Sequence, residues 1–71
     1  MHIGHRIREV LAGQRRSAAW LAESICVTRT HVYKIFDKRT IDIDLLMRVS
    51  RALDHDFFAE LSRAMRSQSP D

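Results

Sequence analysis

Apolar residues recur at helical spacing along most of this chain. Ile3, Ile7 and Val10 begin the pattern, and similar spacings return in four later stretches. Because residues three or four apart lie on one face of a helix, the pattern predicts five helices. No stretch has the pattern of a credible strand, so the expected fold class is all-α.

Residues that favour helix starts mark the expected boundaries. Ser17, Thr28 and Asp42 are natural N-caps, because a side-chain oxygen there can accept hydrogen bonds from the first N–H groups of a helix. Asp56 is expected to cap the last helix in the same way. The predicted helices cover residues 3–12, 18–25, 29–36, 43–53 and 57–66. The expected apolar stripe of the fourth helix comprises Ile43, Leu46, Val49 and Leu53.

Residues 18–37 carry the most informative pattern, that of two short helices joined by a tight turn. Their buried-type residues are Leu21, Ala22, Ile25, Val27, Val32 and Ile35. Polar and cationic side chains at the start of the second helix point away from this core. A helix pair with these properties suits the major groove of DNA.

The length of 71 residues allows one domain with a modest core, whose stability is expected to be marginal or helped by oligomerisation. We place this domain at residues 1–66 and a disordered tail at residues 67–71.

Residues 1–39 hold eight arginine and lysine residues against three acidic residues, whereas residues 40–71 hold four arginine residues against six acidic residues. This asymmetry suits a polyanionic partner, although an unevenly charged solvated surface would produce it as well.

Several function classes lack the residues that they require. The single cysteine cannot form an internal disulfide and no Cys/His set has zinc-ligand spacing, so we expect no metal and no cofactor. No nucleophile is paired with a base at helical spacing, and the two glycines form no phosphate loop. We therefore expect neither an enzyme nor a small-molecule substrate. No apolar run has the length of a signal peptide or a membrane span, so we expect a cytoplasmic protein without membrane contact.

A family resemblance rests on the phrases WLAES, TRTHVYKIF, IDIDLLMRVS and HDFF. Together with the helix order, they resemble the Cro/phage-repressor-like, or XRE-type, helix-turn-helix family of bacterial and phage regulators. The resemblance covers residues 3–62. Within the paired helices, Ala22 is the small residue where the helices cross and Cys26 stands in the turn, and Val32 and Ile35 face the core.

The resemblance implies a five-helix helix-turn-helix domain that reads double-stranded DNA as a homodimer. The second helix of the pair would enter the major groove. The implied base contacts are Arg29, Thr30, Tyr33 and Lys34. The implied sugar-phosphate contacts are Ser17, Thr28, Lys38 and Arg39. A sequence-specific transcriptional regulator that represses by occupancy is the simplest interpretation, since no sensor or activation domain is visible.

The chemistry of these side chains supports the same roles. Arg29 can extend its planar guanidinium toward guanine O6 and N7, and Lys34 lies on nearly the same helix face. Thr30 can offer its hydroxyl to a base or a phosphate, or its methyl group to thymine. Tyr33 can stack, contact a thymine methyl group or bond a phosphate. A solvated helix face would carry the same residues, and that alternative stays open.

Two positions depart from the family pattern. Ala18 stands where well-known repressors often have a glutamine that braces the recognition helix and a phosphate. Cys26 replaces the usual glycine of the turn, where a left-handed backbone costs other residues roughly 1–2 kcal/mol. We expect Cys26 to be a buried or half-buried turn residue rather than a redox sensor.

Aromatic and apolar residues near the last helix point to dimer contacts. Phe57 is expected to seal the core, and the adjacent Phe58 cannot share its face. The dimer candidates are Phe58, Leu61, Met65 and Trp20. Trp20 has a second interpretation, in which it lies across the first helix and completes the core. The runner-up function is a protein-interaction or antitoxin-type module with secondary DNA binding.

Overall fold

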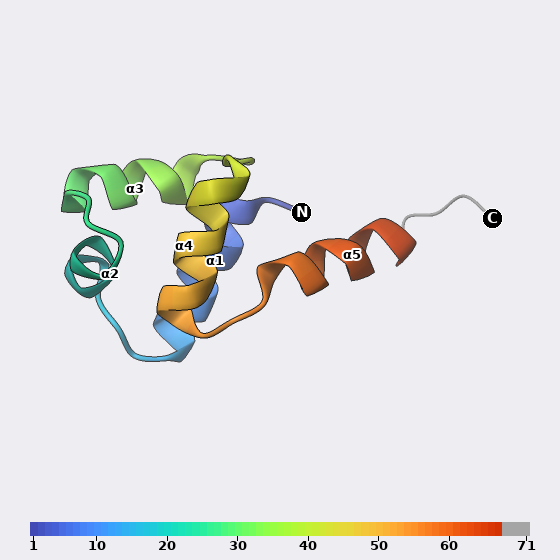
Figure 1. Cartoon of the computed structure of the whole chain (residues 1–71), viewed down its shortest axis with the longest axis horizontal. Helices are drawn as coiled ribbons and strands as arrows, with labels where there is room; N and C mark the ends of the chain where they lie inside the picture. Colours follow the sequence, from blue (N-terminus) through green and yellow to red (C-terminus); the bar gives the residue numbers. More distant parts are fainter. Residues whose placement is uncertain (68–71) are drawn as a thin grey trace.

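The computed structural model describes residues 1–67 of the chain, and every regular element in that range is a helix. The helices are α1 (Ile3–Gly13), α2 (Ala18–Ser24), α3 (Arg29–Asp37), α4 (Ile43–Leu53) and α5 (Phe57–Ser67) (Figure 1). They confirm the all-α expectation. Relative to the prediction, α1, α3 and α5 each end one residue later and α2 ends one residue earlier. The predicted disordered tail therefore begins one residue too early, at Ser67, and its other residues, 68–71, lie outside the described residues.

Each helix start has a side chain that accepts a backbone hydrogen bond from the N–H group three residues later. Ser17 and Thr28 accept these bonds at 3.1 Å. Asp42 and Asp56 accept theirs at 2.8 and 3.0 Å. These four caps confirm the predicted helix starts. His2 caps α1 through Nδ1 at 3.1 Å, which the sequence did not predict.

Helices α1 to α4 enclose the hydrophobic core, to which α5 contributes one aromatic ring. The largest fully buried side chains are Ile7, Leu21, Val32, Ile35, Val49, Leu53 and Phe57. Phe57 therefore seals the core as predicted. Two predicted core positions differ, because Val27 is half-buried and Ile43 is 67% exposed. Ile43 lies about 120° around α4 from Val49, so it falls outside the buried stripe.

The start of α1 approaches the end of α3 so closely that Gly4 has no room for a side chain. A Cβ atom at Gly4 would lie closer than 3.0 Å to the carbonyl oxygen of Ile35. The Gly4 N–H also donates to the Lys38 carbonyl at 2.9 Å, and the Ile3 N–H donates to the Arg39 carbonyl at 3.0 Å. These contacts fix the path of the chain as it leaves α3.

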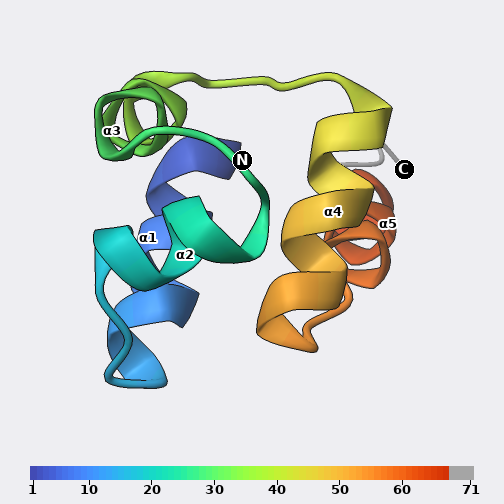
Figure 2. The same cartoon turned by 60° about the vertical axis from the view of Figure 1, so that its left-hand side comes forward.

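Helix α5 projects away from the body formed by α1 to α4 (Figure 1). This arrangement makes the molecule elongated, with extents of 42 × 20 × 19 Å. A second view shows α2 and α3 on one side of the body, with α4 and α5 on the other (Figure 2). The surface of α3 and the surface of α5 are therefore presented separately.

Candidate nucleic-acid interface

Residues 25–28 connect α2 to α3 by a tight turn. Cys26 adopts a left-handed backbone there, with a φ angle of 60°, as predicted for this position. The Val27 N–H donates to the Ala22 carbonyl at 2.9 Å, and the Cys26 N–H donates to the Glu23 carbonyl at 3.3 Å. The expected burial of Cys26 is wrong, because the turn leaves its side chain outside the core and exposed.

The core holds the α2–α3 pair from its inner side. Ala22 of α2 is buried, and Val32 and Ile35 on the inner face of α3 are fully buried. Complete burial of a valine or isoleucine side chain contributes about 1.5–3 kcal/mol. The packing of the inner face therefore fixes the orientation of α3 on the body. As a result, the outer face of α3 points in one defined direction.

The outer face of α3 brings together the four residues predicted to contact bases. These residues are Arg29, Thr30, Tyr33 and Lys34, and all four are exposed. Arg29 lies four residues before Tyr33, and Thr30 lies four residues before Lys34, so both pairs are neighbours on the helix surface. The Tyr33 ring meets Phe36 edge-on at a centroid distance of 6.0 Å.

The four residues predicted to contact the sugar-phosphate backbone lie at the ends of α2 and α3. They are Ser17, Thr28, Lys38 and Arg39, and all are exposed. Ser17 and Thr28 use an oxygen lone pair to cap their helices, which leaves the hydroxyl proton available to a phosphate oxygen. Lys38 and Arg39 follow α3 directly, and their carbonyl groups are held by the start of α1.

The cations at and after α3 are available for an external anion. Within residues 1–67, no ion pair involves Arg29, Lys34, Lys38 or Arg39. The ion pairs that the described residues do form involve Arg6 and His55, which contact Glu60 or Glu9 instead. Unpaired cationic side chains can displace the counterions condensed on a nucleic-acid backbone.

Two arginines that support this helix pair were missed by sequence reasoning. Arg48 of α4 donates to the Ile25 carbonyl at the end of α2. Arg16 lies over the ring of Trp20, with Cζ 3.9 Å from the ring centroid. The spacing of Arg16 and Trp20, four residues apart, is a local signal that could have indicated their contact. Arg48 and Ile25 are 23 residues apart, and no local pattern could have paired them.

Three of the four dimer candidates form an apolar strip on α5. Phe58, Leu61 and Met65 are 38%, 36% and 69% exposed. Their spacing of three and four residues places them on one helix face. The fourth candidate, Trp20, lies on α2 at the other side of the body (Figures 1 and 2), and it is half-buried against the core. The structure therefore does not bring Trp20 together with the α5 strip.

Comparison of the chain with protein-family models, curated proteins and solved structures finds no match. Among residues 1–67, no three His, Cys, Asp or Glu side chains gather as a group that could hold a metal ion. In the same part of the chain, no helix combines the length and apolar character needed to cross a bilayer.

Proposed function

We propose that this protein is a sequence-specific, double-stranded DNA-binding regulator that places α3 in the major groove. The observation that carries the proposal is the outer face of α3, where Arg29 and Lys34 lie without ion pairs among the described residues. A helix with its side chains is about 10–12 Å across and the major groove is about 12 Å wide, so α3 fits.

The side chains on this face supply both kinds of contact that a DNA reader needs. Arg29, at the first position of α3, donates in a fork to guanine O6 and N7, and Lys34 reaches a neighbouring base. Thr30 and Tyr33 contact a thymine methyl group or a phosphate. Beside them, Lys38 and the other predicted backbone contacts fix the position of the domain on the duplex without reading sequence.

The local geometry supports an XRE-type helix-turn-helix fold for residues 3–62. Ala22 is buried, as expected for the small residue at the crossing of the two helices. Cys26 has the left-handed backbone that the turn of this family requires. We place the protein in a bacterial cytoplasm, where such regulators meet their DNA.

A homodimer completes the proposal, because one α3 helix reads only one half-site. The α5 strip of Phe58, Leu61 and Met65 is our proposed dimer surface, since an exposed apolar strip on a projecting helix can pair with its own copy. We propose repression by occupancy of the operator. The same exposed strip favours the second candidate function, an interaction module whose main partner is another protein.

The test is a binding selection from random-sequence duplex DNA, followed by titration of the selected sequences over a salt series. We expect enrichment of an inverted repeat and an affinity that falls steeply with salt. Arg29→Ala should reduce discrimination at one base position of each half-site by about 1–3 kcal/mol. Arg8→Ala is the matched control, because Arg8 is an exposed arginine on α1.

Weak binding without sequence preference would contradict the proposal. Equal effects of Arg29→Ala and Arg8→Ala would contradict the assignment of α3 as the reading helix. Retention of biological function by the Arg29→Ala, Lys34→Ala double variant, with DNA binding lost, would favour the protein-interaction module.

A further inference from the structure

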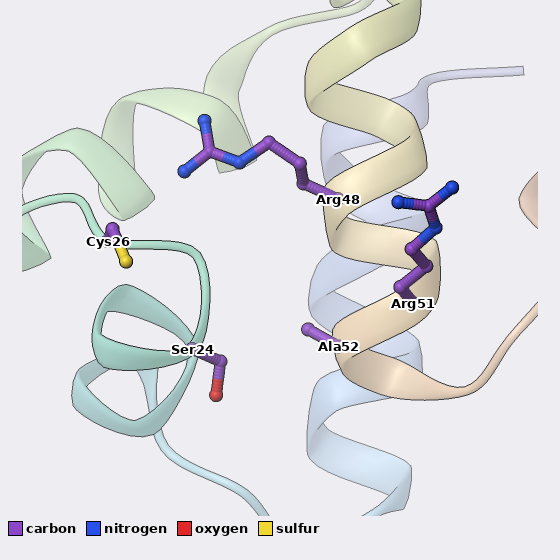
Figure 3. Close-up of a pocket in the computed structure, with 5 residues that line it drawn as sticks. All are labelled: Ser24, Cys26, Arg48, Arg51 and Ala52. Carbon is purple, nitrogen blue, oxygen red and sulfur yellow. The ribbon is translucent and has the colours of Figure 1, made fainter.

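A groove runs between α2 and α4, on a surface that the proposed DNA contact does not use. One part is an open cleft of about 370 Å³ lined by Ser24, Cys26, Arg48, Arg51 and Ala52 (Figure 3). The adjoining part is a cleft of about 420 Å³ lined by Gln14, Arg16, Ala52, Leu53 and Asp54. The two clefts are neighbours that share Ala52 as a lining residue, and we call the pair of clefts the α2–α4 groove. No residue of α3 lines it.

Three arginines give the α2–α4 groove a positive charge. Arg48 and Arg51 lie one helical turn apart on α4, and Arg16 comes from the segment before α2. Among the described lining residues, Asp54 is the single acid. Within residues 1–67 none of the three arginines forms an ion pair, so the groove has a charge excess that its own side chains do not neutralise.

The arginine at each end of the groove is held in place by the fold. Arg48 reaches toward the α2–α3 connection, as Figure 3 shows, and donates to the Ile25 carbonyl. Arg16 donates from Nε to Gln14 Oε1 at 3.2 Å and lies against the Trp20 ring. Gln14 is itself anchored, since its Nε2 donates to the Leu53 carbonyl at 2.7 Å. Guanidinium groups restrained in this way lose less side-chain entropy when they bind an anion.

The lining also has an apolar component that distinguishes it from a plain phosphate-binding surface. Ala52 is half-buried, and the exposed Cys26 lines the cleft from the α2–α3 turn (Figure 3). Apolar lining together with arginines suits a segment that carries both carboxylates and aliphatic side chains. Guanidinium groups bind carboxylates through paired, charge-assisted hydrogen bonds. Because both clefts are open to solvent and meet at Ala52, an extended chain can contact both clefts, whereas a compact small molecule would contact only one.

We propose that the α2–α4 groove binds an acidic, partly aliphatic peptide segment of a partner protein. Arg51 and Arg16 pair with carboxylates of that segment, and Ala52 contacts its aliphatic side chains. Arg48 contributes charge while it holds the end of α2. The groove shares no lining residue with the eight proposed DNA contacts, so variants can test the two surfaces separately.

The test is an NMR titration of the isotope-labelled full chain with a short synthetic peptide of Glu-Glu-Leu repeats. A peptide of Gln-Gln-Leu repeats is the matched probe without charge. We expect the glutamate peptide to shift the signals of Ser24, Ala52 and the Trp20 indole N–H, and the glutamine peptide to leave them unchanged. Arg51→Gln and Arg16→Gln should each weaken binding about two- to fivefold, the effect of losing one solvent-exposed ion pair.

Two control variants make the result specific to the groove. Arg63→Gln removes the same charge from the exposed surface of α5 and should leave peptide binding unchanged. The Arg29→Ala, Lys34→Ala variant should also bind the peptide normally, which separates this proposal from DNA binding. Arg48 is left intact, because its loss would disturb the end of α2.

Four results would overturn the proposal. The first is the absence of shifts at the groove at millimolar peptide. The second is equal binding of the glutamate and glutamine peptides. The third is an equal loss of binding in the Arg51→Gln and Arg63→Gln variants. The fourth is a shift of the groove signals by duplex DNA in place of the peptide, which would make the groove a phosphate-binding surface.

Discussion

Arg6 and Glu60 form a two-point ion pair that joins α1 to α5 across 54 positions of the chain. Arg6 Nε donates to Glu60 Oε1 at 2.7 Å, and an Nη atom donates to Glu60 Oε2 at 3.1 Å. His55 Nε2 also contacts Glu60 Oε2. The Glu60 side chain is only 10% exposed, whereas Arg6 and His55 are 36% and 30% exposed, so the cluster is a partly buried attachment point for the projecting helix.

The Glu60 cluster predicts a loss of stability in acid. The hydrogen bond from Arg6 is the main cause that lowers the pKa of Glu60 from 4.5 to about 2, while burial opposes the shift. A lowered pKa in the folded state means that the stabilisation is present above pH 4.5 and is lost as the pH falls toward 2. We expect Glu60→Gln to lower the free energy of unfolding by about 2 kcal/mol at pH 7 and to have little effect near pH 2.

Urea unfolding of the two proteins at several pH values measures this difference. Glu9→Gln is the control, because Glu9 also pairs with Arg6 but is 67% exposed. It should change stability by less than about 0.5 kcal/mol. A Glu60→Gln effect that stayed constant from pH 7 to pH 2 would contradict the ionic origin of the stabilisation.

Gly4→Ala should destabilise the fold, because the added Cβ would collide with backbone carbonyl oxygens at the end of α3. Overpacking of this kind costs about 1–3 kcal/mol. Gly13→Ala is the matched control, since a Cβ at Gly13 meets nothing within 4 Å. It should be neutral or stabilising by up to about 1 kcal/mol, because alanine favours the helix. Thermal unfolding followed by circular dichroism compares the two, and equal melting temperatures would disprove the close approach of α1 and α3.

Cys26→Gly should be neutral or stabilising, because Cys26 has a left-handed backbone that glycine adopts without strain. The relief of about 1 kcal/mol is partly offset by the greater entropy of glycine in the unfolded chain. Cys26→Ala is the control, since it removes the thiol and keeps the strain. A clear drop in the melting temperature of the glycine variant would mean that the turn is assigned to the wrong residues.

Lys38→Ala should weaken the binding of all DNA sequences alike, in contrast to Arg29→Ala. Lys38 follows α3 and is exposed, and the proposed complex assigns it a phosphate contact rather than a base contact. Its loss should reduce the slope of log affinity against log salt by about one. Fluorescence anisotropy with one selected and one scrambled duplex measures both quantities. A change in the affinity ratio of the two duplexes would assign Lys38 a base contact.

Phe58→Ser should dissociate the proposed homodimer without unfolding the monomer. Phe58 is 38% exposed on the apolar strip of α5 and lies outside the hydrophobic core of the described residues. Truncation of an aromatic residue at the centre of an interface costs about 2 kcal/mol or more of binding free energy. Sedimentation equilibrium measures the change, with Tyr33→Ser as the control because Tyr33 is an exposed aromatic on α3. An unchanged dimer constant in both variants would place the interface elsewhere.

Local features of the sequence determined the helix starts and the turn. The caps at Ser17, Thr28, Asp42 and Asp56 depend on a side chain and an N–H group three residues away, so they are encoded in a few neighbouring positions. The left-handed backbone at Cys26 also depends on neighbouring residues, so the position of this residue in the turn could be predicted from the sequence. The exposed face of α3 follows from helical periodicity, which also determines which residues face the core.

The tertiary structure decided the relationships between distant segments. The need for glycine at position 4, the anchoring of Arg48 on the Ile25 carbonyl and the attachment of Glu60 to Arg6 each join elements far apart in the chain. The exposure of Ile43 likewise depends on how α4 is rotated against the other helices, and an apolar pattern alone does not specify that rotation. Periodicity reports which residues share a helix face, whereas packing in three dimensions determines what that face contacts.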